Sequence, residues 1–347
     1  MEILNILPRP TGLKKAEIID LLLREEYGYL PAEPYSVTAN YISRDAAFCA
    51  GKADLVTLEL SCKATWGEFT FPLYYVCPKG KDKPIPCFIH INFRNLIPDK
   101  YQPTEELVDA GYATLTFCYK DVASDDSDFG NGLARIVYPD GKRKSNQCGK
   151  IGLWAWAALR VLEYALTLPE LDPGRISVAG HSRLGKTALL AGALDERFYC
   201  AFSNDSGCSG AALSREKKGE TIRDICKTFP YWFCKNYEKY VDREEELPFD
   251  QHYLLAANIP HKVYVASAVE DQWSHPENEY LSCVAASEYY EGYGLTGFIH
   301  PERMACVGDS FQEGSIGYHL RSGKHYFSRE DWNQYLRYLE KQYEYHL

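Results

Sequence analysis

The chain has 347 residues, 46% of them hydrophobic, which is enough to bury a large core. It carries 48 acidic and 38 basic side chains, so its net charge of −10 gives no electrostatic reason to bind a polyanion, and we expect no nucleic-acid partner. Its apolar stretches fall far short of the roughly 20 residues that span a bilayer, so we also expect no membrane partner.

The beginning of the chain lacks the basic start and apolar stretch of a secretory signal, since Glu2 follows Met1 and prolines stand at positions 8 and 10. The twelve cysteines lie largely in hydrophobic runs, and no two have the two-residue spacing of a zinc or redox motif. We therefore expect reduced thiols and a cytoplasmic location. No clustered metal ligands or phosphate-binding glycine loop occur, so we expect neither a metal nor an organic cofactor.

The first elements that the sequence predicts are an amphipathic helix over residues 14–29 and an antiparallel pair of strands at 55–60 and 69–77. The chain shows no internal repeat and no long linker, which favours a single domain over residues 1–347. Within it, residues 1–80 form the helix and antiparallel strands, and residues 81–347 form the core that carries any active site.

From residue 86 onward, short apolar runs alternate with helical segments. The runs are typical of strands buried on both faces of a parallel sheet. The predicted strands cover residues 86–91, 112–117, 176–179, 199–202, 262–266 and 316–320, with a helix over 153–168 and a last helix that Ser328 and Asp331 cap. This order predicts the α/β class: a mostly parallel central sheet with helices on both faces, as in the α/β-hydrolase fold.

Ser182 lies directly between the strand at 176–179 and a helical segment at 186–193, within the sequence Gly-His-Ser-Arg-Leu-Gly-Lys. A nucleophile elbow needs this context, because a sharp strand-to-helix turn lifts the serine hydroxyl above the sheet. The elbow pattern usually has its second glycine two residues after the serine, where Leu184 stands here, and Gly185 follows. A serine that only caps the helix would suit the same position, so the motif alone leaves both roles open.

A nucleophilic serine needs a histidine as base and a carboxylate that orients it, in the chain order serine, acid, histidine. His325 is the best-placed base, in the loop after the strand at 316–320, whereas His319 within that strand suits a packed residue. Asp205 and Asp271 each end a predicted strand, and either could be the acid. The backbone N–H of Arg183 would be one oxyanion donor, and its guanidinium could also stabilise the developing charge.

Several linked motifs resemble the glucuronoyl esterases of carbohydrate esterase family 15 and their acetylxylan esterase relatives. The motifs lie at residues 180–186, 206–215, 219–221, 229–233 and 271–273. The resemblance implies an α/β-hydrolase with Ser182 as nucleophile, His325 as base and Arg183 at the oxyanion. It places the acid at either Asp205 or Asp271, which leaves the choice open.

The same resemblance places Lys186, Glu220 and Trp273 where the family contacts a uronic sugar. Fungal members have a disulfide-bonded cysteine before the serine, where His181 stands here. The expected reaction is hydrolysis of a carbohydrate ester, most simply a glucuronoyl ester, through an acyl-enzyme. The alternatives are removal of acetyl groups from xylan-type sugars and a catalytically silent sugar-binding relative. The expected partner is a small-molecule or oligosaccharide ester, and the oligomeric state cannot be read from the sequence.

Overall fold

A computed structural model describes residues 2–80 and 84–344 of the chain. The strands are β1 (Ser36–Asp45), β2 (Ala53–Ala64), β3 (Gly67–Pro78), β4 (Ile85–Asn92), β5 (Ala113–Cys118), β6 (Leu171–His181), β7 (Cys200–Asn204), β8 (Lys262–Ala268), β9 (Ser310–Phe311) and β10 (Ile316–Arg321). They form one sheet in the order β1-β2-β3-β5-β4-β6-β7-β8-β10-β9. The strands from β5 to β10 in this order pair in parallel, and antiparallel strands complete both edges.

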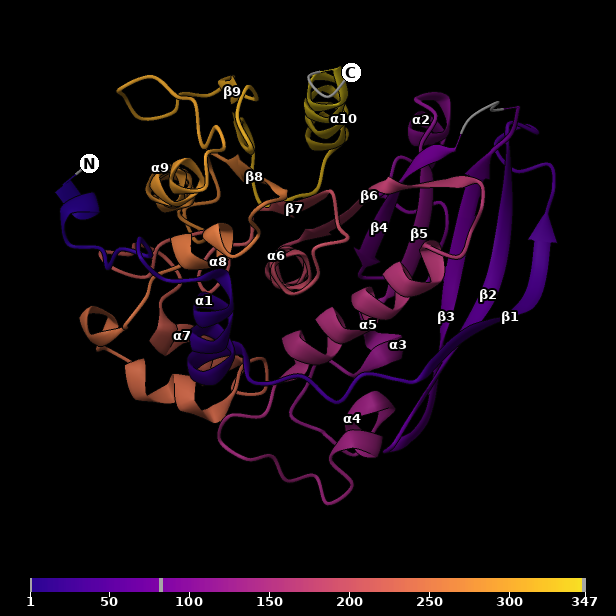
Figure 1. The fold of residues 1–347 in the computed structure, drawn as a ribbon, viewed down its shortest axis with the longest axis horizontal. Helices are drawn as coiled ribbons and strands as arrows, with labels where there is room; N and C mark the ends of the chain where they lie inside the picture. The colour runs from indigo at the N-terminus through magenta and orange to yellow at the C-terminus, as the bar shows by residue number, and fades with distance from the viewer. Residues whose placement is uncertain (1, 81–83, 345–347) are drawn as a thin grey trace.

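Helices cover both faces of this sheet. The α-helices are α1 (Lys15–Leu22), α2 (Thr104–Asp109), α3 (Tyr119–Val122), α4 (Gly132–Val137), α5 (Lys150–Ala165), α6 (Arg183–Leu194), α7 (Ile222–Thr228), α8 (His252–Ala256), α9 (Pro276–Gly292) and α10 (Arg329–Glu344). Short helical turns are η1 (Glu2–Asn5), η2 (Leu23–Tyr27), η3 (Lys235–Tyr240) and η4 (Glu244–Glu246). Figure 1 shows α2 and α10 on one side of the sheet and α5 and α6 on the other. Within the described ranges, none of these helices has the length and apolar character to cross a bilayer.

The α/β class predicted from the sequence is confirmed, including the mostly parallel sheet with helices on both faces. The sheet has two more antiparallel strands than the sequence predicted, because β1 pairs with β2 at one edge and β9 pairs with β10 at the other. The predicted boundary between the two parts of the domain, at residue 81, lies outside the described residues. The helix predicted over 14–29 is α1 followed by the π-helical turn η2, and it ends before Gly28.

The parallel register decides where the polar side chains gather. In a parallel sheet the carboxyl ends of all strands lie at one edge, where the loops carry the reactive groups. At that edge β6 is followed by Ser182, β7 by Asp205, β8 by the loop with Asp271, and β10 by the loop with His325. Four residues that are far apart in sequence therefore meet on neighbouring loops.

A buried acid ties η2 to the rest of the chain. Glu26 is fully buried, and both of its carboxylate oxygens accept hydrogen bonds from the side-chain amide of Gln251, at 3.1 and 3.2 Å. Burial raises the pKa of Glu26 to about 8, because the charged form is poorly solvated there. Glu26 is therefore protonated at neutral pH, and its ionisation opposes folding.

We expect Glu26→Gln to stabilise the protein at alkaline pH. The pKa of Glu26 is higher in the folded protein than its ordinary value of 4.5, so folding loses stability as the pH rises from about 4.5 to about 8. The neutral amide removes this loss, which amounts to at most about 1.4 kcal/mol per pH unit. Thermal unfolding at pH 5 and pH 8.5 checks this: the advantage of the variant in Tm should be much larger at pH 8.5.

Glu25→Gln, at the neighbouring position, is the matched control. Its expected effect on stability is the opposite, because the pKa of Glu25 is lowered and not raised. Burial opposes ionisation of Glu25, but hydrogen bonds from Lys239 and Arg24 outweigh it and lower its pKa. Its amide variant should therefore be less stable than the wild type at both pH values. An advantage for Glu26→Gln that does not grow with pH would contradict a buried, neutral Glu26.

Candidate active site

Ser182 forms the turn between β6 and α6. Its φ of 57° and ψ of −128° lie in a region that L side chains rarely adopt. The preceding Gly180 makes the turn possible, because a Cβ there would lie 2.0 Å from the carbonyl oxygen of Leu184. Within the described first turn of α6, the Ser182 hydroxyl accepts no hydrogen bond from a backbone N–H. The hydroxyl is therefore not used as a helix cap.

The displaced glycine of the motif has its own structural role. Gly185 lies in the first turn of α6, where a Cβ would be 3.0 Å from the Oγ of Ser203 on β7 and 3.1 Å from the Cβ of Ser206. A glycine at this point lets α6 approach β7 and its following loop closely. Leu184, which stands at the usual glycine position, is fully buried in the core.

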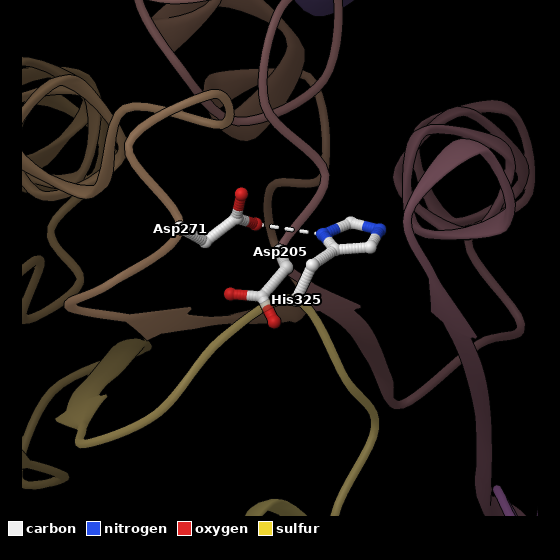
Figure 2. Close-up of side chains that lie close together, drawn as sticks. All are labelled: Asp205, Asp271 and His325. Atoms are coloured by element: carbon white, nitrogen blue, oxygen red, sulfur yellow. Dashed lines mark hydrogen bonds and ion pairs between the residues drawn. The ribbon is translucent and has the colours of Figure 1, made fainter.

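His325 is paired with Asp271. The Nδ1 of His325 lies 2.6 Å from the Oδ2 of Asp271, and Figure 2 shows the other ring nitrogen directed away from both nearby carboxylates. The Oδ2 of Asp271 also accepts a 2.5 Å hydrogen bond from the hydroxyl of Ser274. With Nδ1 donating to the carboxylate, Nε2 is left as the basic nitrogen.

The electrostatic environment suits Asp271 as a charged partner. Burial of Asp271 on its own would raise its pKa, but the hydrogen bonds from His325 and Ser274 outweigh burial and lower the pKa below its ordinary value. A carboxylate that stays ionised next to a histidine fixes the ring orientation and stabilises the imidazolium form.

Asp205, the other candidate acid, is engaged elsewhere. Its Oδ1 accepts a 2.8 Å bond from the N–H of Ala268, and its Oδ2 lies 3.2 Å from the guanidinium of Arg321. Burial, with repulsion from the neighbouring Glu279, raises the pKa of Asp205 well above its ordinary value. Figure 2 draws Asp205 beside His325 with no interaction between them. The geometry therefore couples His325 to Asp271 and not to Asp205.

Asp205, Asp271 and His325 also have the spacing of a metal site. One potential ligand atom from each lies within 4.8 Å of the others, the one such group found within residues 2–80 and 84–344. However, Nδ1 of His325 and Oδ2 of Asp271 are bonded to each other, and both oxygens of Asp205 already have partners. A metal would have to break these bonds, so the donor set suits a hydrogen-bonded acid–base pair better than a metal centre.

His181 forms the floor under His325. Its ring centroid lies 4.4 Å from that of His325, and its Nδ1 is 2.6 Å from the Oδ1 of Asn204. Burial, reinforced by repulsion from His325, lowers the pKa of His181 to about 3. His181 is therefore neutral, and it is the residue directly before Ser182. His181 was not predicted from the sequence as a site residue.

The side chain of Arg183 lies between a carboxylate and aromatic rings. Its guanidinium forms an ion pair with Asp125 and lies 4.8 Å from the ring centroid of Trp232. Asp125 also accepts hydrogen bonds from the Trp232 indole at 2.8 Å and from the hydroxyl of Tyr119 at 2.9 Å. The side chain of Arg183 is 25% exposed, so the cation is fixed in place yet still borders solvent.

Asp125 was not predicted from the sequence as a site residue. It belongs to the acidic run Ser124-Asp125-Asp126-Ser127-Asp128 in a loop 58 residues from Arg183. Nothing in that run distinguishes the aspartate that turns inward from those that are solvated.

The three residues implied to contact a sugar lie on adjoining segments. Lys186 is buried, with its ammonium bonded to the carbonyls of Ser206 and Cys208 and 3.9 Å from the Glu220 carboxylate. The N–H of Glu220 donates to the carbonyl of Trp273 at 3.0 Å, which ties the two loops together. The Trp273 side chain is 56% exposed beside the acid loop. These residues therefore bring an ammonium, a carboxylate and an indole together on linked segments, one of which carries Asp271.

Residues 61–294 match a family model described as glucuronyl esterase, fungi. The chain belongs to the glucuronoyl esterases, carbohydrate esterase family 15. A solved glucuronoyl esterase from Solibacter usitatus is 31% identical, with a TM-score of 0.88 over 96% of this chain and 93% of that one. The family and the α/β-hydrolase fold expected from the sequence are thus confirmed.

Two characterised relatives have longer chains. The carbohydrate esterase MZ0003, from an unknown prokaryotic organism, is 39% identical over 241 residues, or 68% of this chain and 55% of that protein. A 4-O-methyl-glucuronoyl methylesterase of Podospora anserina is 29% identical over 318 residues, or 87% of this chain and 61% of that protein. This glucuronoyl esterase family member therefore spans less than two thirds of the length of either relative.

The geometry predicts unequal effects for the two acids. We expect Asp271→Asn to lower kcat for an ester substrate by roughly 10³ to 10⁴-fold, because the amide favours the wrong tautomer of His325. Asp205→Asn should lower kcat far less, because the Asp271–His325 bond remains. Steady-state kinetics of the two variants, with thermal unfolding to check folding, measures this. A larger loss in the Asp205 variant would reverse the assignment.

Proposed function

We propose that this chain is a serine esterase that hydrolyses esters of glucuronic acid. One observation carries the proposal: Ser182 stands in a strained turn with its hydroxyl free of the helix, and the ring of the preceding His181 lies 4.4 Å from that of His325, which is paired with a buried carboxylate. Family membership adds the reaction class, since relatives over most of this chain are 4-O-methyl-glucuronoyl methylesterases.

The chemistry follows from the roles that the geometry supports. Nε2 of His325 accepts the proton of the Ser182 hydroxyl as the oxygen attacks the ester carbonyl. The resulting oxyanion is stabilised by the backbone N–H and guanidinium of Arg183. The tetrahedral intermediate expels the alcohol, which takes the proton from His325, and leaves the uronic acid esterified to Ser182. Water, deprotonated by His325, then releases the acid and restores the serine.

The surroundings support a uronic acid as the acyl half. Lys186, Glu220 and Trp273 offer a cation, a hydrogen-bond acceptor and an apolar ring face on linked segments, and Trp273 belongs to the loop of Asp271. A sugar ring binds well to such a set, because its hydroxyls need polar partners and its C–H face packs against an aromatic side chain. We therefore propose that these three residues contact the glucuronoyl group of a small or oligomeric ester.

Replacement of the nucleophile is the direct test. We expect Ser182→Ala to lower kcat on the methyl ester of 4-O-methyl-glucuronic acid by about 10⁴-fold or more, because no other group can form the acyl-enzyme. Ser43→Ala, on the exposed strand β1, is the matched control and should keep wild-type activity. Esterase activity that persists undiminished in folded Ser182→Ala would rule out Ser182 as nucleophile.

The same assay decides between the two ester classes. Wild-type kcat/KM for the glucuronate methyl ester should exceed that for an acetylated xylo-oligosaccharide. The opposite ranking, with Ser182→Ala inactive on both, would keep the serine mechanism and replace the glucuronoyl substrate by an acetyl ester.

Trp273→Ala should weaken substrate binding and leave the chemistry nearly unchanged. We expect KM for the glucuronate ester to rise about tenfold and kcat to change by less than about threefold, since packing against the sugar ring is made in both the ground and transition states. Tyr41→Ala removes a similarly exposed aromatic side chain on β1 and is the control. An unchanged KM in Trp273→Ala would remove the indole from the proposed sugar contacts.

A further inference from the structure

Arg321 occupies the end of β10, four residues before His325. Its side chain is only 10% exposed. The Nε donates to both oxygens of Asp331, at 2.9 and 3.0 Å, and one terminal nitrogen donates to Asp205 at 3.2 Å. One arginine thus links two fully buried carboxylates on different elements, the loop after β7 and the first turn of α10.

The same guanidinium binds the loop that carries His325. One terminal nitrogen donates to the carbonyls of Ser322 and Lys324, at 3.0 and 3.2 Å, and the other donates to the carbonyl of Tyr326. Two of these three carbonyls belong to the residues on either side of His325. Counting the bonds to the carboxylates, every N–H of the guanidinium has an acceptor.

This loop has few other anchors. Gly323 exchanges two hydrogen bonds with Glu270, through its N–H to the carboxylate and its carbonyl to the backbone N–H, and the carbonyl of Arg321 accepts from the N–H of Val269. His325 itself is bonded only through its ring to Asp271 among the hydrogen bonds of the described residues, and its side chain is 43% exposed. Packing of Phe327 in the core also holds this segment, but the carbonyls on either side of His325 are hydrogen-bonded by Arg321.

Arg321 also bears on the choice between the two acids. Asp205 offers an oxygen within 4.8 Å of ligand atoms of both His325 and Asp271, so it is near enough to compete for the histidine. Its Oδ2 instead faces Arg321, and its Oδ1 is held by the N–H of Ala268. The guanidinium of Arg321 is thus hydrogen-bonded to Asp205, the carboxylate that does not pair with His325.

We propose that Arg321 is a positioning residue of this esterase: its guanidinium folds the loop around His325 and engages Asp205, so that the imidazole pairs with Asp271. The proposal rests on the proposed function of His325 as the base. Arg321 touches neither the substrate nor the reacting atoms. It acts through the position of the imidazole, where a displacement of about 1 Å can cost about 10²-fold in rate.

Three variants test the proposal. Arg321→Met removes every donor, and Arg321→Lys keeps the charge but cannot reach three carbonyls and two carboxylates at once. Arg329→Met is the matched control, since Arg329 is 78% exposed and forms only an ion pair with Glu106 among the described residues. Thermal unfolding confirms that each variant is folded before its kinetics are compared.

We expect Arg321→Met to lower kcat on the glucuronate methyl ester by about 10²-fold, with KM changed by less than about threefold. Arg321→Lys should lose about tenfold in kcat, and Arg329→Met should match the wild type. The downfield proton resonance of His325 Nδ1–H, assigned by its absence from His325→Gln, should be lost or shifted in Arg321→Met and unchanged in Arg329→Met.

A folded Arg321→Met with wild-type kcat and an unchanged resonance would overturn the proposal. If Arg321→Met does not fold, Arg321→Lys decides, and wild-type kcat with an unchanged resonance in that variant would overturn it equally. The resonance needs no substrate. A wild type that hydrolyses no glucuronate ester would therefore refute the proposed function, while the resonance would still test whether Arg321 positions His325.

Discussion

Ser182 is held with a φ of 57° between β6 and α6, a conformation that costs an L side chain on the order of 1–3 kcal/mol. Two contacts of the surrounding elements hold this turn. Gly180 lies against the backbone of Leu184, and the N–H of Ser182 donates a 2.8 Å hydrogen bond to the carbonyl of Asn204. The strain keeps the hydroxyl above the sheet edge, where the loops after β7, β8 and β10 converge.

The site combines two electrostatic environments that do different work. Around His325, the carboxylate of Asp271 binds Nδ1, so Nε2 is left as the basic nitrogen. His181, under the ring, is neutral and adds no charge. Around Arg183, a buried carboxylate and aromatic rings hold a permanent cation. In the proposed mechanism, the first environment accepts and returns a proton and the second stabilises developing negative charge. Their separation suits acyl transfer, in which a proton is removed from one atom while charge develops on another.

The sequence predicted those elements and loops whose positions follow from local hydrophobic periodicity and turn residues. The parallel strands, the position of Ser182 after β6, the capped helix α10 and the loop that carries His325 all follow from periodicity and turn chemistry. The sequence could not choose between Asp205 and Asp271, because both end neighbouring parallel strands and the choice depends on which oxygens the N–H of Ala268 and Arg321 occupy. Asp125 was missed because its contact with Arg183 joins segments 58 residues apart. Strand β1 was missed because one exposed edge strand leaves only a weak alternation.

The proposed mechanism depends on Ser182 being a nucleophile that His325 activates. Covalent labelling with a serine-directed fluorophosphonate, followed by peptide mapping, tests that claim without depending on the identity of the ester. We predict a single adduct on the peptide that contains Ser182, formed rapidly by the wild type and at a greatly reduced rate by His325→Ala. No adduct, an adduct on another serine, or an equal rate in His325→Ala would contradict the account.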